Sequence, residues 1–590
     1  MRKQFGIFGV VLAAIAILNL VLQSTFSLQV LTLTLIWAAA GIAWNIPATA
    51  GQISLGHAAF TGIGAYGFVF LATNYGISPW LGMLISMVIA ALLALIIGIP
   101  TFRLQGFYFT LATLAFPLIL MLLVIAGGHP EMTVPFRPDE RFASMQFVEP
   151  RSFGWLALIT FAIVGGLGLF IGESKLGRTL EAIRDNEVLA RSIGVKTLVW
   201  KLGAFCVSAA ICAAIGVIWV NAILLVVSAE EVFGFGVSIV LISVTFIGGI
   251  GRFWGPVVGA ALLIPLAQLL TAEIGGRVPG AEAIVYGLAL VLVALLTPRG
   301  IYPTLVDAIR RARGRGTQAP SRVDNSPDAA GWAALHESHA PVEGLILEVT
   351  ELEKRYGGLA VLTDTTFTVS AGARLGLIGP NGAGKTTLFN LLTGHATPDG
   401  GRIVYRGREI SALSAPARVK LGISRTFQVP QGFKSMTAAQ NVEIAALGSG
   451  LLPAEADRAT RAILHAVGLG ERSELPPSSL TAYELKLLEL ARACVSRPRL
   501  LLLDEPLAGL NEGERARFFA ALDLVVDAET AVVVIEHSVK ALLGFASELL
   551  ALDGGRMIAS GDPRGVVRNP QVIEAYLGKK YATAYSLTDD

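Results

Sequence analysis

The sequence predicts a multi-domain protein: an all-α polytopic membrane domain of about ten transmembrane helices, followed by an α/β P-loop domain. Hydrophobic residues make up 53% of the 590 positions and charged residues only 15%, which is too apolar for a soluble protein. The apolar runs are concentrated in the first half of the chain. The second half has an ordinary globular composition, and residues 379–387 fit the phosphate-binding pattern G-x-x-x-x-G-K-[ST] at every fixed position.

Apolar runs in the first half predict the membrane spans, because each approaches the ~20 residues that cross a bilayer. They lie at 6–23, 28–48, 58–73, 80–101, 106–127, 154–172, 202–226, 232–250, 253–272 and 282–298. Lysines and arginines such as Arg103, Arg252 and Arg299 then fall on one side, which the positive-inside rule makes the cytoplasm. We expect the first run to be retained rather than cleaved as a signal peptide, because no clear small-residue cleavage site follows it.

Charge and cysteine content exclude other classes of function. The net charge of +2 gives no electrostatic reason to expect a nucleic-acid partner. Cys206, Cys212 and Cys494 form neither a disulfide framework nor a zinc-ligand spacing. Cys206 and Cys212 fall within one apolar run, so we expect them to pack as small hydrophobic side chains.

Three stretches of the first half resemble the M-type permease of branched-chain amino acid ABC importers. They are Gly51-Gln-Ile-Ser-Leu-Gly-His57-Ala-Ala-Phe60, Arg103-Leu-Gln-Gly106-Phe-Tyr-Phe-Thr-Leu-Ala-Thr-Leu114 and Gly248-Gly-Ile-Gly251-Arg-Phe-Trp-Gly-Pro256. Thr297-Pro-Arg-Gly300 is similar to the end of that family's last helix. The resemblance covers about 28–303 and implies a permease domain at 1–303. Within it, His57 is either a functional ionisable group or a helix-packing residue.

A charged amphipathic segment, 173–201, separates the sixth and seventh runs. It is either a solvated loop or a coupling segment that docks on the nucleotide-binding domain and transmits its closure. We favour coupling, because Glu181-Ala182 followed by Gly194 resembles this loop in ABC importer permeases. Farther along, 304–345 lacks apolar periodicity and predicts a flexible linker whose basic start lies against membrane lipid headgroups. A regulatory site in this linker is the alternative.

The phosphate-binding pattern has the expected context, since a β-rich run precedes it at 373–378 and a helix-like run follows at 388–393. We expect its glycines to let backbone N–H groups surround a phosphate, Lys385 to add a charge and Thr386 to offer Mg²⁺ a hydroxyl. The predicted nucleotide-binding residues are Gly379, Pro380, Asn381, Gly382, Ala383, Gly384, Lys385, Thr386 and Thr387. ATP and Mg²⁺ are the expected ligand and cofactor.

Two further apolar runs end in polar residues, as buried parallel strands do when they deliver side chains to one sheet edge. The run 499–503 ends at Asp504, expected to hold Mg²⁺ through water, and Glu505, expected to act as general base. The run 531–535 leads to His537, which we expect to contact the γ-phosphate as a catalytic residue.

Gln428 and Tyr356 complete the predicted ATP site. Gln428 can reach the metal and sense the permease, so it is assigned to both the catalytic and the metal-binding sets. Tyr356 precedes two glycines and offers adenine a stacking surface, unless it is only a strand aromatic. The set resembles the G-type ATPase subunits of branched-chain amino acid ABC importers, on the evidence of 423–428, 507–511 and 572–578. The resemblance implies an ABC ATP-binding domain at 346–579 and a tail at 580–590.

The ABC signature L-S-G-G-Q is degenerate in this chain, which reads Leu480, Thr481, Ala482, Tyr483 and Glu484. Ala482 and Tyr483 replace two glycines whose lack of a Cβ allows close approach of the backbone. We therefore expect ATP on Lys385 to be hydrolysed with a partner's signature, and the site completed by 480–484 to be slower. Ser538, where G-type subunits usually carry aspartate, is a smaller departure.

The resemblance implies half of a transporter for ATP-driven import across the bacterial inner membrane, with the ATPase domain in the cytoplasm. The expected partners are an H-type permease, an F-type ATPase and a periplasmic substrate-binding protein, with a homodimer as the alternative. Branched-chain amino acids are the expected solutes, and urea, short amides or other small solutes are the alternative. A membrane-anchored ATPase without transport activity and an ABC exporter are the rival classes.

Overall fold

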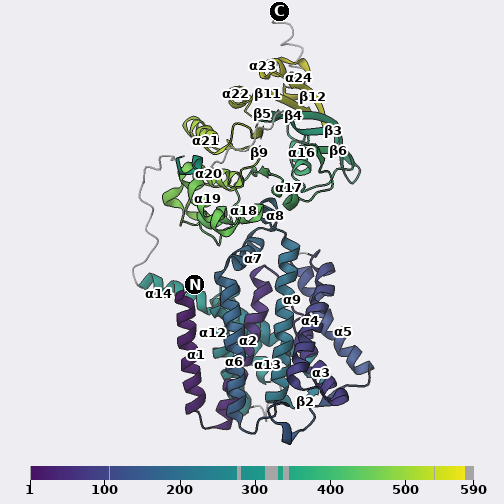
Figure 1. Ribbon diagram of the computed structural model, residues 1–590, viewed down its shortest axis with the longest axis vertical. Helices are drawn as coiled ribbons and strands as arrows, with labels where there is room; N and C mark the ends of the chain where they lie inside the picture. The colour runs from purple at the N-terminus through teal and green to yellow at the C-terminus, as the bar shows by residue number, and fades with distance from the viewer. Residues whose placement is uncertain are drawn as a thin grey trace, which may run out of the picture. The chain divides into compact units, whose positions relative to one another are not determined.

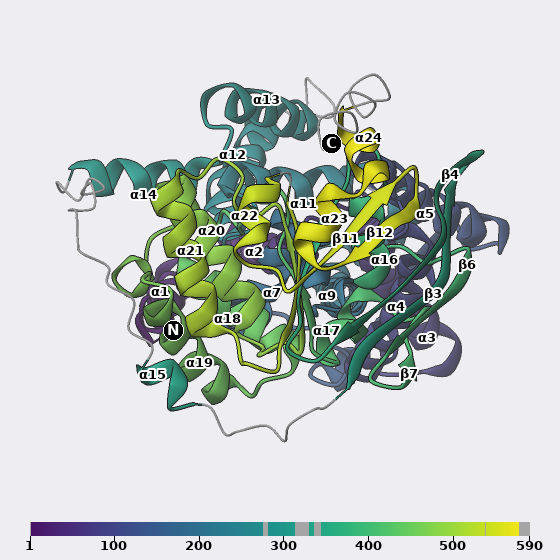
Figure 2. The same cartoon turned by 90° about the horizontal axis from the view of Figure 1, so that it is seen from above.

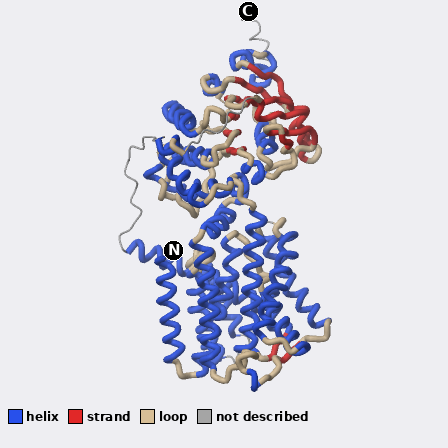
Figure 3. Tube along the Cα trace, viewed as in Figure 1, coloured by secondary structure: helices blue, strands red, loops and turns tan. Residues whose placement is uncertain are grey.

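The computed structural model describes residues 2–104, 106–274, 281–312, 330–335, 344–536 and 538–577. The chain divides into two compact units. One consists of Met1–Arg184 and Leu198–Ala319, and the other of Asp185–Thr197 and Pro320–Asp590. Helices make up nearly all of the first unit, whereas the second combines helices with strands, as Figure 3 shows.

Long apolar helices build the first unit (Figure 1). They are α1 (Arg2–Val21), α2 (Thr25–Thr49), α3 (Ala58–Tyr75), α4 (Pro79–Thr101), α5 (Phe107–Ala126), α6 (Pro150–Glu173), α9 (Thr197–Trp219), α11 (Phe235–Gly248), α12 (Trp254–Ile274) and α13 (Ala281–Leu296). Among the described residues, nine helices are long and apolar enough to cross a membrane, and they match nine of the ten predicted spans. The helix α3 covers the remaining predicted span and is not among these nine.

Shorter elements connect these helices. They are α7 (Lys175–Asp185), α8 (Glu187–Ser192), α10 (Ala229–Phe233), the π-helical turn Val220–Leu224, and α14 (Ile301–Ala312). Two short strands, β1 (Glu131–Thr133) and β2 (Val226–Ser228), pair antiparallel.

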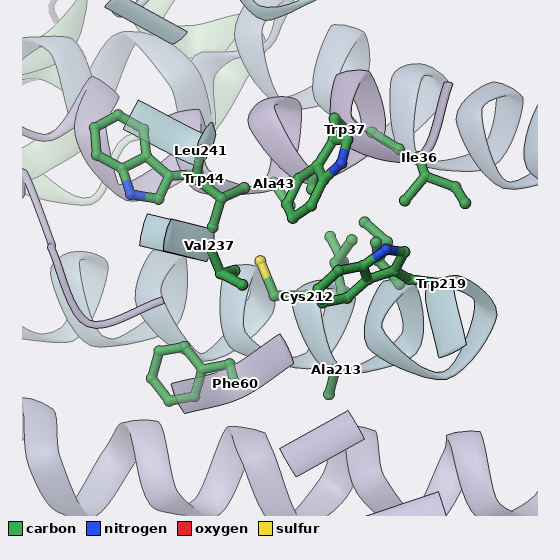
Figure 4. Packing of buried hydrophobic residues seen from close by; sticks show 14 of the residues in the cluster. Ile36, Trp37, Ala43, Trp44, Phe60, Cys212, Ala213, Trp219, Val237 and Leu241 are labelled. Carbon is green, nitrogen blue, oxygen red and sulfur yellow. The ribbon is translucent and has the colours of Figure 1, made fainter. Parts of the chain in front are cut away.

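The core of the first unit forms where α2 packs against α6, α11 and α12. Figure 4 shows large and small side chains of this core packed together, and the rings of Trp37 (α2) and Trp219 (α9) lie 5.3 Å apart between centroids. Cys212 is fully buried in this cluster, as expected for a packed small residue. His57 is 1% exposed, and its Nε2 lies 2.9 Å from the hydroxyl of Ser208. The His57 side chain is therefore buried within the packed helices of the first unit.

A six-stranded sheet forms the centre of the second unit. Its strands are β5 (Arg374–Ile378), β8 (Ile423–Arg425), β9 (Leu500–Asp504), β10 (Ala531–Ile535), β11 (Glu548–Asp553) and β12 (Arg556–Gly561). Their order is β12-β11-β5-β10-β9-β8, and only β12 runs antiparallel to its neighbour. The predicted buried strands before Asp504 and His537 are thus confirmed as parallel neighbours. Because they are parallel, the carboxyl ends of β5, β10 and β9 meet at one edge.

A second, antiparallel sheet has the order β4-β3-β6-β7, with β3 (Leu345–Tyr356), β4 (Leu359–Ser370), β6 (Gly400–Tyr405) and β7 (Arg408–Glu409). The helices of this unit include α16 (Lys385–Leu392), α17 (Ala415–Lys420), α18 (Ala438–Ser449), α19 (Pro453–Ala466), α20 (Ala482–Cys494), α21 (Glu512–Val525), α22 (Val539–Leu543), α23 (Pro563–Arg568) and α24 (Pro570–Leu577). Helices α18–α21 gather on one side of the six-stranded sheet and the antiparallel sheet on the other (Figures 1 and 2).

One short helix, α15 (Ala330–Ala333), lies within the segment predicted as a flexible linker. It packs against α19. Its Trp332 is fully buried, with the Arg497 guanidinium 5.1 Å from the ring centroid. This part of the linker therefore belongs to the packed structure of the second unit.

Candidate active site

The phosphate-binding loop leads from β5 into α16, as the sequence predicts. Gly382 and Gly384 have φ angles of +82° and +103°, which favour glycine. A Cβ on Gly384 would also lie only 2.8 Å from the carbonyl oxygen of Val361. The Lys385 ammonium donates to the carbonyl oxygens of Gly379 and Pro380 at 2.6 and 2.9 Å. The Lys385 ammonium is thus bound to backbone carbonyls of its own loop.

Burial and nearby acids shift the pKa of Lys385 in opposite directions, and this residue is 7% exposed. Burial lowers its pKa, while the charges of Glu505 and Asp504 oppose that shift. The same proximity places the predicted metal-binding and catalytic acids near the phosphate-binding lysine. A cation that retains its charge can stabilise the negative phosphates of a nucleotide.

Asp504 ends β9 and is 2% exposed. Its Oδ2 accepts from Arg425 Nη2 at 3.3 Å, and its backbone N–H donates to the Thr426 hydroxyl at 3.2 Å. Burial raises the pKa of Asp504, and Arg425 partly offsets this effect. Asp504 is therefore held by a buried cation that the sequence analysis did not assign to the site.

Gln428 and Glu505 lie in direct contact, although 77 positions separate them. Gln428 Nε2 donates to Glu505 Oε2 at 3.0 Å. Glu505 has a φ angle of +48°, a left-handed conformation that costs a residue with a side chain ~1–2 kcal/mol. Its backbone N–H donates to the Ile535 carbonyl at the end of β10, at 2.9 Å. The surrounding structure thus fixes the conformation of the predicted general base.

The oxygen donors near this acid pair suit Mg²⁺. Thr386 offers an exposed hydroxyl, Gln428 an exposed amide and Asp504 a carboxylate. Mg²⁺ prefers such hard oxygen ligands and, when bound, neutralises charge that develops on transferring phosphate oxygens. The residues present therefore fit the predicted ion.

The remaining predicted ATP-site residues are His537 and Tyr356. His537 lies outside the described residues. Its neighbour Glu536 is buried and accepts from the Leu507 N–H at 2.7 Å, which joins the loops after β10 and β9. Tyr356 ends β3 with half of its surface exposed, and Lys354 Nζ lies 5.4 Å from its ring centroid. The Tyr356 ring is thus accessible for stacking.

The degenerate signature forms the start of α20. Thr481 caps this helix: its hydroxyl accepts from the Glu484 N–H at 3.2 Å, and Glu484 Oε2 accepts from the Thr481 N–H at 2.8 Å. Glu484 also pairs with Arg472 at 3.4 Å. The Arg517 guanidinium lies 5.0 Å from the Tyr483 ring centroid. Leu480 is buried and Ala482 is exposed. The hydroxyl and the acid of this segment are therefore engaged in capping their own helix.

Residues 185–197, hereafter the 185–197 segment, belong to the second unit. Asn186 Nδ2 donates to Gln431 Oε1 at 2.5 Å, and Asp185 Oδ2 accepts from the Ser435 N–H at 2.7 Å. Gly194 has a φ of +96° and lies against Gly448 of α18. The apolar residues Leu189, Ala190, Ile193 and Val195 of this segment are buried as well. The segment therefore contacts the ATPase fold through buried apolar side chains as well as through backbone and short polar groups.

The other two predicted coupling residues lie in the first unit. Ala182 is fully buried in α7. Glu181 lines a cavity of about 120 Å³ together with Asn45 and Arg252. Of the three residues predicted from the coupling pattern, only Gly194 therefore lies in the ATPase unit.

Three residues near the site were assigned no role from the sequence. The first is Arg425, which contacts Asp504. The second is Lys486, whose Nζ donates to the Glu505 carbonyl at 2.9 Å. The Tyr576 hydroxyl accepts from the Gly379 N–H of the phosphate-binding loop at 2.7 Å. Tyr576 lies in a stretch used for the family resemblance, yet no spacing indicated this contact. A signal for Lys486 existed in the three-residue spacing of Lys486, Glu489 and Arg492.

Comparisons with known proteins agree with this division. Residues 26–294 match the family model of the branched-chain amino acid transport system permease component. Residues 362–508 match the ABC transporter model, and residues 556–582 match the branched-chain amino acid ATP-binding cassette transporter model. The family models thus cover both units.

Curated relatives match the second unit. The high-affinity branched-chain amino acid transport ATP-binding protein LivG of Salmonella typhimurium is 36% identical over 250 residues, covering 40% of this chain and 98% of LivG. The protein BraF of Pseudomonas aeruginosa, with the same description, shows the same identity and coverage. The lipopolysaccharide export system ATP-binding protein LptB of Acidithiobacillus ferridurans is 32% identical, covering 40% of this chain and 98% of LptB.

A solved structure, the ADP conformation of an ATP-binding cassette of an ABC transporter, is 28% identical and covers 40% of this chain and 100% of that chain, with a TM-score of 0.37. The relatives and family models assign ATP hydrolysis coupled to transport to the second unit. The apolar helices and the permease match make the protein a membrane protein. The chain belongs to the branched-chain amino acid ABC transporter family and joins a permease and an ATP-binding subunit in one polypeptide.

Proposed function

We propose that this chain is the combined permease and ATPase subunit of an ABC importer that carries branched-chain amino acids across the bacterial inner membrane. The observation that carries the proposal is the permease match over 26–294 on the same chain as a LivG-like ATPase. The relative LptB belongs to an export system, so the ATPase half alone does not fix the direction of transport. The permease half supports import, and it argues against an ATPase with a simple membrane anchor.

In the proposed reaction, Glu505 acts as general base towards the water that attacks the γ-phosphate of ATP. Gln428 orients this carboxylate through its 3.0 Å hydrogen bond, and Lys385 stabilises negative charge on the phosphates. Asp504, whose carboxylate contacts Arg425, would hold Mg²⁺ through water. Hydrolysis then resets the domain closure that the 185–197 segment transmits to the permease.

We further propose that the chain works in a heteromer rather than a homodimer. In ABC proteins, each ATP lies between two nucleotide-binding domains and receives the signature of the opposite one. Here Ala482 and Tyr483 replace the two signature glycines, whose lack of a Cβ allows close approach of the backbone to a γ-phosphate. The Thr481 hydroxyl is engaged as a helix cap. A second ATPase of F type would supply an intact signature to the ATP on Lys385, and an H-type permease and a periplasmic binding protein would complete the importer.

Uptake into proteoliposomes tests the solute and the direction. The chain is reconstituted with the subunits that copurify with it, and leucine, isoleucine, valine, urea and acetamide are offered with their binding protein. We expect ATP-dependent accumulation of the three amino acids. Accumulation of urea or acetamide alone would transfer the proposal to the alternative solutes, and ATP-driven efflux would refute import.

Replacing Glu505 with glutamine tests the catalytic assignment in the same preparation. We expect most ATP turnover to disappear, because the site built on Lys385 is the active one. Largely intact turnover would show that the site completed by 480–484 carries the hydrolysis, and the proposed asymmetry would then be wrong.

A further inference from the structure

Helix α20 carries three buried charged residues at three-residue spacing, Lys486, Glu489 and Arg492, here called the ionic ladder. Their exposed fractions are 5%, 3% and 4%. Residues at this spacing lie on one face of a helix. Buried ion pairs lose much of their attraction to desolvation, and apolar replacements are often neutral or stabilising. Stability alone therefore does not account for three charges on this face, and their contacts point to another role.

The side chains of the ladder form hydrogen bonds with backbone groups of the segment 428–431. Lys486 Nζ donates to the Gln428 carbonyl at 3.4 Å, and Glu489 Oε1 accepts from the Gln431 N–H at 3.3 Å. Arg492 Nη1 donates to the Gln431 carbonyl at 2.5 Å and pairs with Glu489 at 3.3 Å. Both ends of this short segment are thus fixed to a rigid helix. One end carries the side chain that contacts Glu505.

Lys486 also holds the peptide group of Glu505, whose carbonyl accepts from Nζ at 2.9 Å. A single ammonium therefore joins the backbones of Gln428 and Glu505, while the two side chains bond each other. Burial lowers the pKa of Lys486, but the charges of Glu489, Glu536, Glu505 and Asp504 oppose this shift. The left-handed backbone of Glu505 needs such external support.

The far end of the segment 428–431 reaches the 185–197 segment. Gln431 Oε1 accepts from Asn186 Nδ2 at 2.5 Å. Asn186 is itself fixed as the N-cap of α8, where its Oδ1 accepts from the Leu189 N–H at 2.9 Å. Hydrogen bonds therefore link Asn186 to Gln431 and Gln431 to Glu489 and Arg492. Earlier on the same helix, Lys486 continues the route to Gln428 and Glu505.

We propose that Lys486 is a positioning residue for ATP hydrolysis, and that the ionic ladder makes the placement of Gln428 and Glu505 depend on the 185–197 segment. The proposal rests on the proposed catalytic role of Glu505 and adds a physical route by which the membrane-domain loop acts on it. Lys486 touches neither nucleotide nor water in this role. It acts through the two peptide groups that it holds.

The substitution Lys486→Met keeps the aliphatic stem and removes the ammonium. ATPase activity is measured on the full-length chain with its copurifying subunits in proteoliposomes. We expect kcat to fall about 10- to 100-fold, because small misplacements of catalytic groups have effects of this size, while KM for ATP stays within about twofold. Lys486→Arg retains a donor and should recover most of the lost rate. Lys540→Met is the matched control, since the Lys540 side chain is 90% exposed, and it should leave kcat unchanged.

A second variant tests the far end of the route without loss of the helix cap. Asn186→Asp retains the acceptor for the Leu189 N–H, and aspartate is a good N-cap, but it cannot donate to Gln431. We expect a several-fold lower kcat with thermal unfolding of the ATPase unit unchanged. This variant also decides the matter should Lys486→Met fail to fold.

Three results would overturn the proposal: wild-type kcat in Lys486→Met, a loss that appears only as a higher KM, or no effect of Asn186→Asp. The parallel variant Glu505→Gln separates the two levels of inference. If Glu505→Gln remains active, the catalytic assignment fails. If Glu505→Gln is inactive while Lys486→Met turns over normally, only the ladder fails.

Discussion

Replacing Gly448 with alanine tests whether the 185–197 segment must approach α18 closely. A Cβ built on Gly448 would lie closer than 3.0 Å to the carbonyl oxygen of Ile193, a separation that Cβ atoms in proteins essentially never show. A Cβ on Gly194 would meet the Gly448 carbonyl in the same way. The two backbones therefore touch here with no side chain between them.

The same substitution should have opposite effects in two contexts. Gly448 lies in the last turns of α18 without a left-handed backbone, so alanine should stabilise this helix by up to about 0.5–1 kcal/mol. In the isolated ATPase domain, 346–579, this amounts to a rise in Tm of about 1–4 °C. In the full chain, the new Cβ must displace Ile193 and Gly194, and such overpacking costs about 1–3 kcal/mol. The gain in stability should therefore vanish in the full chain. The equilibrium constant for contact between the 185–197 segment and α18 should fall by roughly 5- to 150-fold.

Thermal unfolding of the isolated domain and of the full chain measures the first effect. The second effect is measured in proteoliposomes as the ratio of ATPase activity with solute and binding protein to basal ATPase activity. We expect that ratio to fall while the basal rate stays unchanged. Gly513→Ala is the matched control, because a Cβ at this helical glycine meets only the Asn511 side chain at an ordinary 3.5 Å. A Gly448→Ala chain that keeps both the stability gain and normal stimulation would refute the close-approach reasoning.

Three further variants, one of them a double substitution, test other parts of the ATPase unit. Tyr576→Phe removes the acceptor of the phosphate-loop N–H and should weaken ATP binding several-fold at constant kcat, measured by nucleotide titration; Tyr405→Phe, which removes another buried hydroxyl, should not. Burial raises the pKa of Glu489 from 4.5 to about 7, so the folded domain binds more protons than the unfolded chain in this window. Its free energy of unfolding should fall as pH rises from 4.5 to 7, and denaturant titrations of Glu489→Gln should lack this slope. The pair Tyr483→Gly and Glu484→Gln restores two signature residues and keeps the helix cap, so the ATPase rate of the assembly should rise, and an unchanged rate would contradict the proposed asymmetry.

Local patterns predicted the fold class and the parts of the site that follow strands. The phosphate-binding loop and the run ending at Asp504 and Glu505 are contiguous, and their physical meaning depends only on neighbours in the chain. The helix α3 also follows its predicted apolar run, although glycines and polar residues interrupt that run. The burial of Trp332 was missed, since an isolated tryptophan in a Pro/Ser/Asp-rich linker shows no periodicity.

Contacts between distant segments could not be predicted from one sequence. The Tyr576 hydroxyl meets Gly379 across 197 positions, and Asn186 meets Gln431 across 245. Such pairs follow from strand order and helix packing rather than from spacing. The buried charges of α20 gave a partial signal, because charged residues on an apolar helix face are rarely buried without partners. Apart from the Glu489–Arg492 pair, however, the hydrogen bonds described above join these charges to backbone groups, which leave no mark in the sequence.

Because the permease and the ATPase are fused, the contact of the 185–197 segment need not hold the two units together by itself. Two separate subunits must stabilise their association through the interface itself, whereas a covalent connection makes docking intramolecular, with an effective concentration of about millimolar for short flexible linkers. The buried apolar side chains of the segment, its backbone contact with Gly448 and the hydrogen bonds of Asp185 and Asn186 can then suffice for docking. In the proposed mechanism, the hydrogen bonds of Asp185 and Asn186 serve to transmit domain closure. Asn186→Asp should therefore leave assembly of the transporter intact and lower the rate at which ATP is hydrolysed.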